Sequence, residues 1–307
     1  MIAVTGASGY IGRAVVAELA RRGLSVAAVS RSANGGKAPA GVEWRCIGAA
    51  LPCAANFAAC DTVIHLAGRA HTTVAVAGGR DLFDEENRQL ALITAEAAHS
   101  IGARRFVFVS TLGVHGRGAN MPLRGDSPAH PDLPYARSKW AAEQELTAWC
   151  AAHEMALCIV RPPMVYGPHC PGNFLRLVRM VRSGMPLPFA ALHAQRSFIY
   201  VDNLASFLAE CATQHATGAY VVADGSDWSV EQLVRAIGAE LQLPVRNFPV
   251  PVALLRLVGK LAGKQREVDS LTLPMLVDAE LARREFGWQP RVAPQDALQL
   301  SVRDYAD

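Results

Sequence analysis

The sequence predicts an α/β protein built on a doubly wound parallel sheet, with a smaller mixed domain after it. Short apolar runs alternate with helical stretches through the first half of the chain, which is typical of strands buried on both faces. The first run leads directly into a glycine-rich turn. After about residue 165 prolines become frequent and the helical pieces shorten. We therefore expect one domain over residues 1–165 and a second over residues 166–307, with some segments of the second returning to the sheet.

The first strand is expected at residues 2–4 and the first helix at 10–22. Apolar Ile11, Val15 and Leu19 recur there at four-residue spacing, so they lie on one helical face. The proline-rich segment 120–134 is expected to be a rigid loop that leads into a long helix. Apolar periodicity predicts further strands at 25–29, 42–47, 62–66, 105–109 and 157–160, and helices at 86–100 and 135–152.

Composition narrows the class of protein. With 51% hydrophobic and 19% charged residues among 307, the chain is too apolar to be disordered. A net charge of 30 − 27 = +3 is too small to indicate a nucleic-acid surface. The seven cysteines form no Cys-x-x-Cys pair and are expected to be small buried side chains. Without a signal-like start or a membrane-length apolar segment, the cytoplasm is the expected location, with no stable membrane insertion.

The longest apolar stretch, residues 251–263, is interrupted by Arg256 and Lys260. It is expected to form an amphipathic helix. Packing into the core is one interpretation of its apolar face, and contact with a membrane surface is the other.

Residues 5–12 read Thr-Gly-Ala-Ser-Gly-Tyr-Ile-Gly between the first strand and the first helix. In such a turn Gly6 permits the tight bend, Gly9 lets the backbone approach a pyrophosphate, and Gly12 lets the helix pack on the strand. The helix start then offers free N–H groups to phosphates. This arrangement predicts a Rossmann-type dinucleotide-binding domain in residues 1–165.

The end of the second strand bears on the choice of cofactor. An NAD site usually places Asp or Glu there, which would repel a 2′-phosphate. This chain has Ser30 and Arg31 instead, and a guanidinium suits a phosphate. NADP(H) is therefore favoured over NAD(H), with an ordinary solvated arginine as the alternative.

Tyr135 and Lys139 form a Tyr-x-x-x-Lys pair at the expected start of a helix. Four residues place both side chains on one helical face. A lysine cation beside the phenol should lower the pKa of Tyr135 from about 10 toward neutrality. Such a tyrosine can exchange a proton with a substrate oxygen while hydride moves at the adjoining carbon.

At this point the chain resembles the extended short-chain dehydrogenase/reductase superfamily, in its NAD-dependent epimerase/dehydratase (sugar-nucleotide) family. The resemblance covers nearly the whole chain. It rests on the glycine turn at 5–12, Tyr-x-x-x-Lys at 135–139, Arg-Pro-Pro-x-Val-Tyr-Gly-Pro at 161–168, Arg-Ser-Phe-Ile-Tyr-Val-Asp-Asn at 196–203 and Arg-Arg-Glu-Phe-Gly-Trp at 283–288.

The resemblance implies three groups of site residues. The catalytic residues are Thr111, Tyr135 and Lys139, and the substrate is contacted by Thr111, Asn173, Arg196 and Arg266. No metal site is implied. The expected cofactor-binding residues are Gly6, Ser8, Gly9, Tyr10, Ile11, Gly12, Ser30, Arg31, Leu66, Ala67, Gly68, Tyr135, Lys139 and Pro162. The sequence departs from the family at Met164, where an asparagine often contacts the substrate, and at 48–50, where Gly-Ala-Ala replaces an Asp near the adenine.

The resemblance leaves several reactions open. Family dehydratases carry an Asp-Glu pair directly after the catalytic Ser/Thr, whereas Leu112 and Gly113 follow Thr111 here. Dehydration is therefore disfavoured, and reduction at C4 of a UDP-4-keto-6-deoxy sugar is favoured. The alternatives are a UDP-sugar 4-epimerase, a reductase of a non-nucleotide carbonyl compound and, last, a non-catalytic NADP sensor. A UDP-linked sugar is the expected partner, a nucleic-acid polymer is not, and pairing into a homodimer stays open.

Overall fold

The computed structural model describes residues 1–32, 38–70, 76–77, 80–303 and 305. Short helical segments of other types are η1 (Ala54–Phe57), the π-helix η2 (Asp84–Gln89) and η3 (Leu112–His115). The strands are β1 (Ile2–Thr5), β2 (Val26–Ser30), β3 (Val42–Cys46), β4 (Thr62–His65), β5 (Val76–Ala77), β6 (Arg80–Asp81), β7 (Arg105–Val109), β8 (Ala156–Arg161), β9 (Met164–Tyr166), β10 (Arg196–Tyr200), β11 (Gly218–Val221) and β12 (Asp227–Trp228). The α-helices are α1 (Tyr10–Arg21), α2 (Leu90–His99), α3 (Pro134–Ala152), α4 (Asn173–Arg182), α5 (Val201–Thr213), α6 (Val230–Glu240), α7 (Val252–Leu261), α8 (Gln265–Thr272), α9 (Glu280–Phe286) and α10 (Pro294–Arg303).

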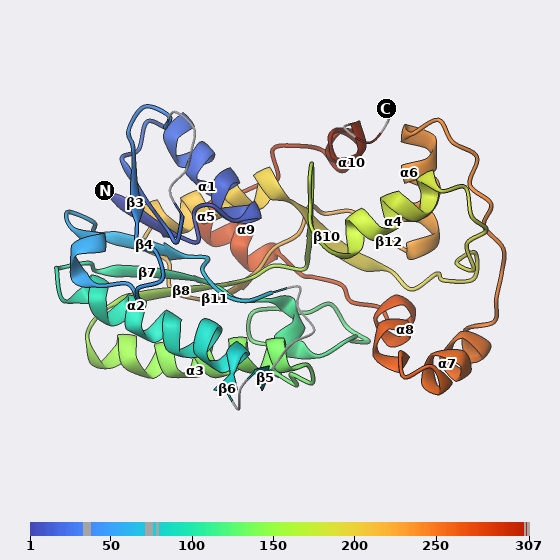
Figure 1. Cartoon of the computed structure of the whole chain (residues 1–307), viewed down its shortest axis with the longest axis horizontal. Coiled ribbons are helices and arrows are strands. Elements are labelled where there is room, and N and C mark those ends of the chain that lie inside the picture. Colours follow the sequence, from blue (N-terminus) through green and yellow to red (C-terminus); the bar gives the residue numbers. More distant parts are fainter. Residues whose placement is uncertain (33–37, 71–75, 78–79, 304, 306–307) are drawn as a thin grey trace.

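The main sheet has the strand order β11-β8-β7-β4-β1-β2-β3, and its neighbouring strands run parallel. Alternate side chains of each strand point to opposite faces, so β1 sends Val4 to one helix layer and Ala3 to the other. α1, α5 and α9 cover the Val4 face, and α2 and α3 cover the Ala3 face (Figure 1). The predicted fold class, a doubly wound Rossmann-type sheet with a smaller mixed part, is confirmed.

The smaller part is built around the three-stranded sheet β12-β10-β9. α4, α6 and α10 pack on it through a second apolar core that includes Phe174, Leu233 and Leu298. α7 and α8 form a helical hairpin that lies apart from the main sheet (Figure 1). Among the described residues, none of the helices is both long and apolar enough to cross a membrane.

The predicted strands and helices have bounds within two residues of those in the structure, and two of the differences have a structural cause. The helix expected at 86–100 begins two residues earlier, as the π-helix η2, and continues as α2. The wider π-helical turn contains the buried side chain of Asn87, which bonds to neighbouring segments rather than to solvent. The strand expected at 157–160 extends to Arg161, because that side chain is buried in an ion pair instead of ending the strand at the surface.

Candidate active site

The glycine turn packs backbone against backbone. Gly6 has φ +68°, and a Cβ there would lie 2.8 Å from the amide nitrogen of Ala67 in the loop after β4. A Cβ on Gly12 would lie 2.2 Å from the carbonyl oxygen of Gly6. No side chain caps the start of α1 at Gly9, so its first N–H groups stay free for an anion. The turn therefore fits a dinucleotide pyrophosphate, with the half-buried Ser8 beside it and Tyr10 and Ile11 beginning the helix.

At the end of β2 the two polar candidates have different roles. The buried Ser30 hydroxyl donates to the carbonyl oxygen of Ser32 at 2.5 Å and so holds its own loop. The Arg31 side chain is exposed, while its backbone carbonyl accepts from the Cys46 thiol. Arg31 is thus the cationic side chain that the described residues of this strand end expose to solvent.

The loop after β4, which contains Leu66, Ala67 and Gly68, is fixed from two sides. The Thr5 hydroxyl lies 3.0 Å from His65 Nδ1 in the core, where burial lowers the pKa of His65 to about 3. The buried Asn87 side chain accepts from the Arg69 amide at 2.8 Å and donates to the Ser138 hydroxyl on α3 at 2.9 Å. Asn87 therefore holds this loop against the helix that carries Tyr135 and Lys139.

Tyr135 and Lys139 lie in the first two turns of α3, as their spacing predicts. The Tyr135 ring packs 6.2 Å from the Phe83 ring, and Lys139 Nζ donates to the Val109 carbonyl at 3.0 Å while lying over the Phe108 ring. Burial raises the pKa of Tyr135 to about 12 and lowers the pKa of Lys139 to about 8. The predicted lowering of the tyrosine pKa by the lysine is absent here, because desolvation of the phenol dominates and the ammonium is directed to a carbonyl.

Thr111 lies two residues after the end of β7 and caps η3. Its hydroxyl accepts from the Gly113 amide at 3.1 Å, and the Leu112 amide donates to the Pro162 carbonyl at 2.8 Å. The residues after Thr111 therefore form a short turn in which Leu112 is buried, and no carboxylate stands at 112 or 113. Pro162 contributes here by holding this turn through its carbonyl.

A buried ionic network connects α3, which carries Tyr135 and Lys139, to the neighbouring strands. Sequence reasoning did not identify this network. Glu143 and Arg161 have 2% and 5% exposed side chains, and the Arg161 Nη2 donates to Glu143 Oε2 at 2.5 Å. Glu143 also accepts from the Ser110 hydroxyl, and Arg161 reaches His115 Nε2 at 3.2 Å. Glu143 follows Lys139 by four residues, and this spacing was the one sequence signal that both side chains lie on the same face of α3. The network ties β7, η3, β8 and α3 together.

The predicted substrate residues fall in different surroundings. Asn173 is exposed at the start of α4. Arg196 is largely buried, and its Nη1 donates to the carbonyls of Leu273 at 2.8 Å and Arg117 at 3.3 Å. Burial lowers the pKa of Arg196 to about 10, so it is cationic at neutral pH. Arg266 belongs to α8, but its side chain lies outside the described residues.

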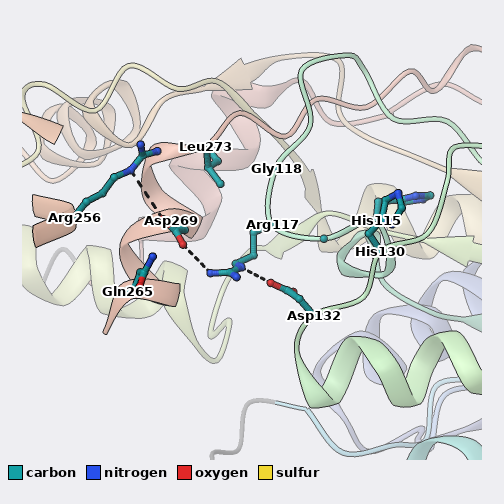
Figure 2. A pocket seen from close by; sticks show the side chains of 10 residues that line it. His115, Arg117, Gly118, His130, Asp132, Arg256, Gln265, Asp269 and Leu273 are labelled. Atoms are coloured by element: carbon teal, nitrogen blue, oxygen red, sulfur yellow. Dashed lines mark hydrogen bonds and ion pairs between the residues drawn. The ribbon is translucent and has the colours of Figure 1, made fainter. Parts of the chain in front are cut away.

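A cavity of about 550 Å³ opens between η3 with the loop after it, the segment before α3, and the α7–α8 hairpin (Figure 2). Arg117 follows η3, Asp132 precedes α3, and Arg256 and Asp269 come from α7 and α8. Arg117 pairs with both aspartates, at 2.7 Å to Asp269, and Arg256 lies 4.0 Å from Asp269. The remaining lining residues are His115, Gly116, Gly118, His130, Gln265 and Leu273. Two guanidinium groups and two carboxylates therefore line the cavity, and a guanidinium is a suitable partner for phosphate. Arg196 lies behind Leu273, with its guanidinium bound to backbone carbonyls.

Residues 2–223 match the model of the NAD dependent epimerase/dehydratase family. A UDP-glucose 4-epimerase of Vibrio cholerae is 32% identical over 79% of this chain and 76% of its own length. A 2-alkyl-3-oxoalkanoate reductase of Stenotrophomonas maltophilia is 30% identical over 97% of both chains.

Two further similarities concern substrate and fold. An N-acetyl-alpha-D-glucosaminyl-diphospho-ditrans,octacis-undecaprenol 4-epimerase of Escherichia coli O157:H7 is 28% identical over 69% of this chain and 66% of its own length. Among solved structures, MoeE5 in complex with UDP-glucuronic acid and NAD superposes with a TM-score of 0.80 at 24% identity, covering 98% of this chain and 97% of MoeE5. This last similarity concerns the fold.

Proposed function

Because the chain belongs to the NAD-dependent epimerase/dehydratase family, we propose that it moves hydride between NADP(H) and C4 of a sugar carried on a diphosphate. One observation carries the proposal. The uncapped start of α1 lies at the carboxyl ends of the neighbouring strands β1, β4 and β7, where Thr111, Tyr135 and Lys139 also lie. Ligands of open α/β sheets bind at these carboxyl ends.

The residues present fit the cofactor. Gly6, Gly9 and Gly12 would hold its pyrophosphate, Arg31 its 2′-phosphate, and the Gly68 loop and Lys139 its nicotinamide ribose. When bound, the nicotinamide supplies or accepts the hydride.

The protein's own groups handle the proton. Tyr135 donates a proton to the sugar O4 as C4 is reduced, and Thr111 donates a hydrogen bond to the same oxygen. Burial favours the protonated form of Tyr135, yet the reaction requires the phenol to give up its proton. A nearby cation stabilises the phenolate and so makes this proton transfer easier. Lys139 can supply this effect by turning its ammonium from the Val109 carbonyl toward the phenol and the ribose.

Within the family, net reduction of a UDP-4-keto-6-deoxy sugar is the activity we favour. The exposed Arg31 suits an NADPH that exchanges at each turnover, whereas an epimerase retains its cofactor. The buried Leu112 and the following Gly113 leave the position after Thr111 without the acid and base that dehydration requires.

A second candidate, 4-epimerisation of a UDP-sugar, is favoured by the similarity to the Vibrio cholerae UDP-glucose 4-epimerase. The Stenotrophomonas maltophilia reductase supports a third candidate, a carbonyl substrate without a nucleotide. The charged cavity lined by Arg117 and Arg256 argues for a diphosphate instead.

The test supplies a UDP-4-keto-6-deoxy-N-acetylhexosamine and NADPH to the purified protein. We expect absorbance at 340 nm to fall with the wild type and not with Tyr135→Phe. Equal rates for the two proteins would contradict the proposed reduction. Interconversion of UDP-glucose and UDP-galactose without added cofactor would establish the epimerase candidate, and turnover of 2-alkyl-3-oxoalkanoates with no binding of UDP would establish the third.

A further inference from the structure

Helix α7 presents an apolar stripe to solvent. Its four members are separated by three, one and three residues, so they lie along one face of the helix. Their exposed fractions are 49%, 55%, 54% and 80% for Leu254, Leu257, Val258 and Leu261. Single exposed apolar side chains are ordinary, whereas four on the ten residues of one helix form a continuous apolar surface.

The opposite face of α7 fixes this orientation. Val252 and Leu255 are partly buried and pack against the smaller apolar core. Gly259 is buried, and a Cβ there would lie 2.6 Å from Val268 Cγ2, so the absence of a side chain lets α8 pack closely. α7 also lies at the periphery of the molecule, away from the main sheet (Figure 1). The apolar stripe therefore faces outward as a consequence of how the hairpin packs.

Cations accompany the stripe. Lys260 and Lys264 are exposed beside the stripe or directly after it, against one exposed carboxylate among the described side chains of the hairpin, Glu267. The third exposed cation, Arg256, lies on the cavity side of α7. The other hairpin carboxylate, Asp269, is paired with Arg117. A helix with leucines on one face and basic residues beside them lies in the interface of a membrane that contains anionic lipids. Packing into the core therefore explains the face of segment 251–263 that carries Val252 and Leu255, but not the exposed stripe.

We propose that α7 docks the protein on an anionic membrane surface, and that a sugar diphosphate anchored in that membrane by a lipid enters the cavity as well as the UDP-linked sugar. Arg256 connects the two parts of this proposal, because it belongs to α7 and lines the cavity that also contains Arg117 and Asp132 (Figure 2). On a helical wheel it lies about 150° from the centre of the stripe, so the leucines can enter the membrane while Arg256 faces the cavity. The docking surface stands on α7 alone, and the lipid-anchored substrate rests on the proposed function.

The test uses flotation of the full-length protein with vesicles of phosphatidylcholine, with and without phosphatidylglycerol. We expect binding to the anionic vesicles, weakened by salt, and a loss of about tenfold or more in Leu257→Asn/Leu261→Asn, because two leucines no longer leave water. Leu300→Asn, which changes a 41% exposed leucine on α10, is the matched control and should bind like the wild type.

Activity separates the two parts of the proposal. With a water-soluble UDP-4-keto-6-deoxy sugar, the double variant should match the wild type. With a polyprenyl-diphosphate-linked 4-keto-6-deoxy sugar in anionic vesicles, its rate should fall by about the same factor as its binding. Vesicle binding without turnover of either substrate would refute the proposed function and leave docking standing.

Three results would overturn the docking surface. These are no binding of the wild type to anionic vesicles, equal binding by the double variant, or a wild-type dimer in analytical ultracentrifugation that the double variant abolishes without any vesicle binding. The last result would assign the stripe to a second copy of the chain.

Discussion

Replacing Glu143 by glutamine should destabilise the fold by about 3–5 kcal/mol, the usual cost of removing one partner of a buried ion pair. The magnitude follows from the burial of both side chains, which are 2% and 5% exposed. Arg161 would keep the Gly125 carbonyl at 2.8 Å and His115 but would lose the carboxylate that balances its charge. Urea unfolding followed by tryptophan fluorescence measures the difference in the free energy of unfolding.

The matched control is Glu145→Gln, two residues along the same helix. Glu145 pairs with Arg88 at 2.6 Å, but the two side chains are 35% and 29% exposed, so solvent screens the pair. This variant should lose less than about 1 kcal/mol. If the two variants were equally destabilised, the reasoning from burial would be refuted. Arg161→Gln added to Glu143→Gln should recover part of the loss, because it removes the unbalanced charge.

Three other predictions concern activity and cofactor binding. Lys139, with its pKa lowered to about 8, loses its proton as pH rises, so kcat/KM should fall above about pH 8 if the cation assists Tyr135; a flat profile to pH 10 would contradict this. Arg31→Asp should weaken NADPH binding relative to NADH by about tenfold or more, and an unchanged ratio of the two Kd values would make Arg31 an ordinary surface residue. Gly12→Ala brings a methyl group to 2.2 Å from the Gly6 carbonyl, so thermal unfolding should occur at lower temperature and NADPH should no longer raise it.

The parts of the structure that local sequence determines could be predicted. Apolar periodicity predicted every strand of the main sheet except β11, and the turn at 5–12 predicted the close approach of α1 to β1, because both depend on neighbouring residues. The spacing of Tyr135 and Lys139 predicted that they share one helical face, because a helix has a fixed period.

The long-range polar contacts could not be predicted in this way. Arg117 meets Asp269 across 152 residues of sequence, and nothing near either residue signals the other. Arg196 was expected to face a diphosphate, but its guanidinium holds two backbone carbonyls whose positions depend on the fold of α8 and of the loop after η3. The direction of the Lys139 ammonium likewise depends on the desolvated surroundings that the folded chain creates.

The late position of β11 and α5 in the sequence has a consequence for folding during synthesis. β11 completes the main sheet beside β8, and α5 covers the face that carries Val4 and Ile64, yet both follow β9 and β10 of the smaller sheet in sequence. During synthesis the central strands therefore leave the ribosome well before the helix that shields them. Until Thr213 has emerged, α1 alone covers part of that apolar face, and the part that α5 covers stays open to other chains. The nascent protein is expected to depend on a chaperone during this interval, and a fragment that stops before α5 should aggregate.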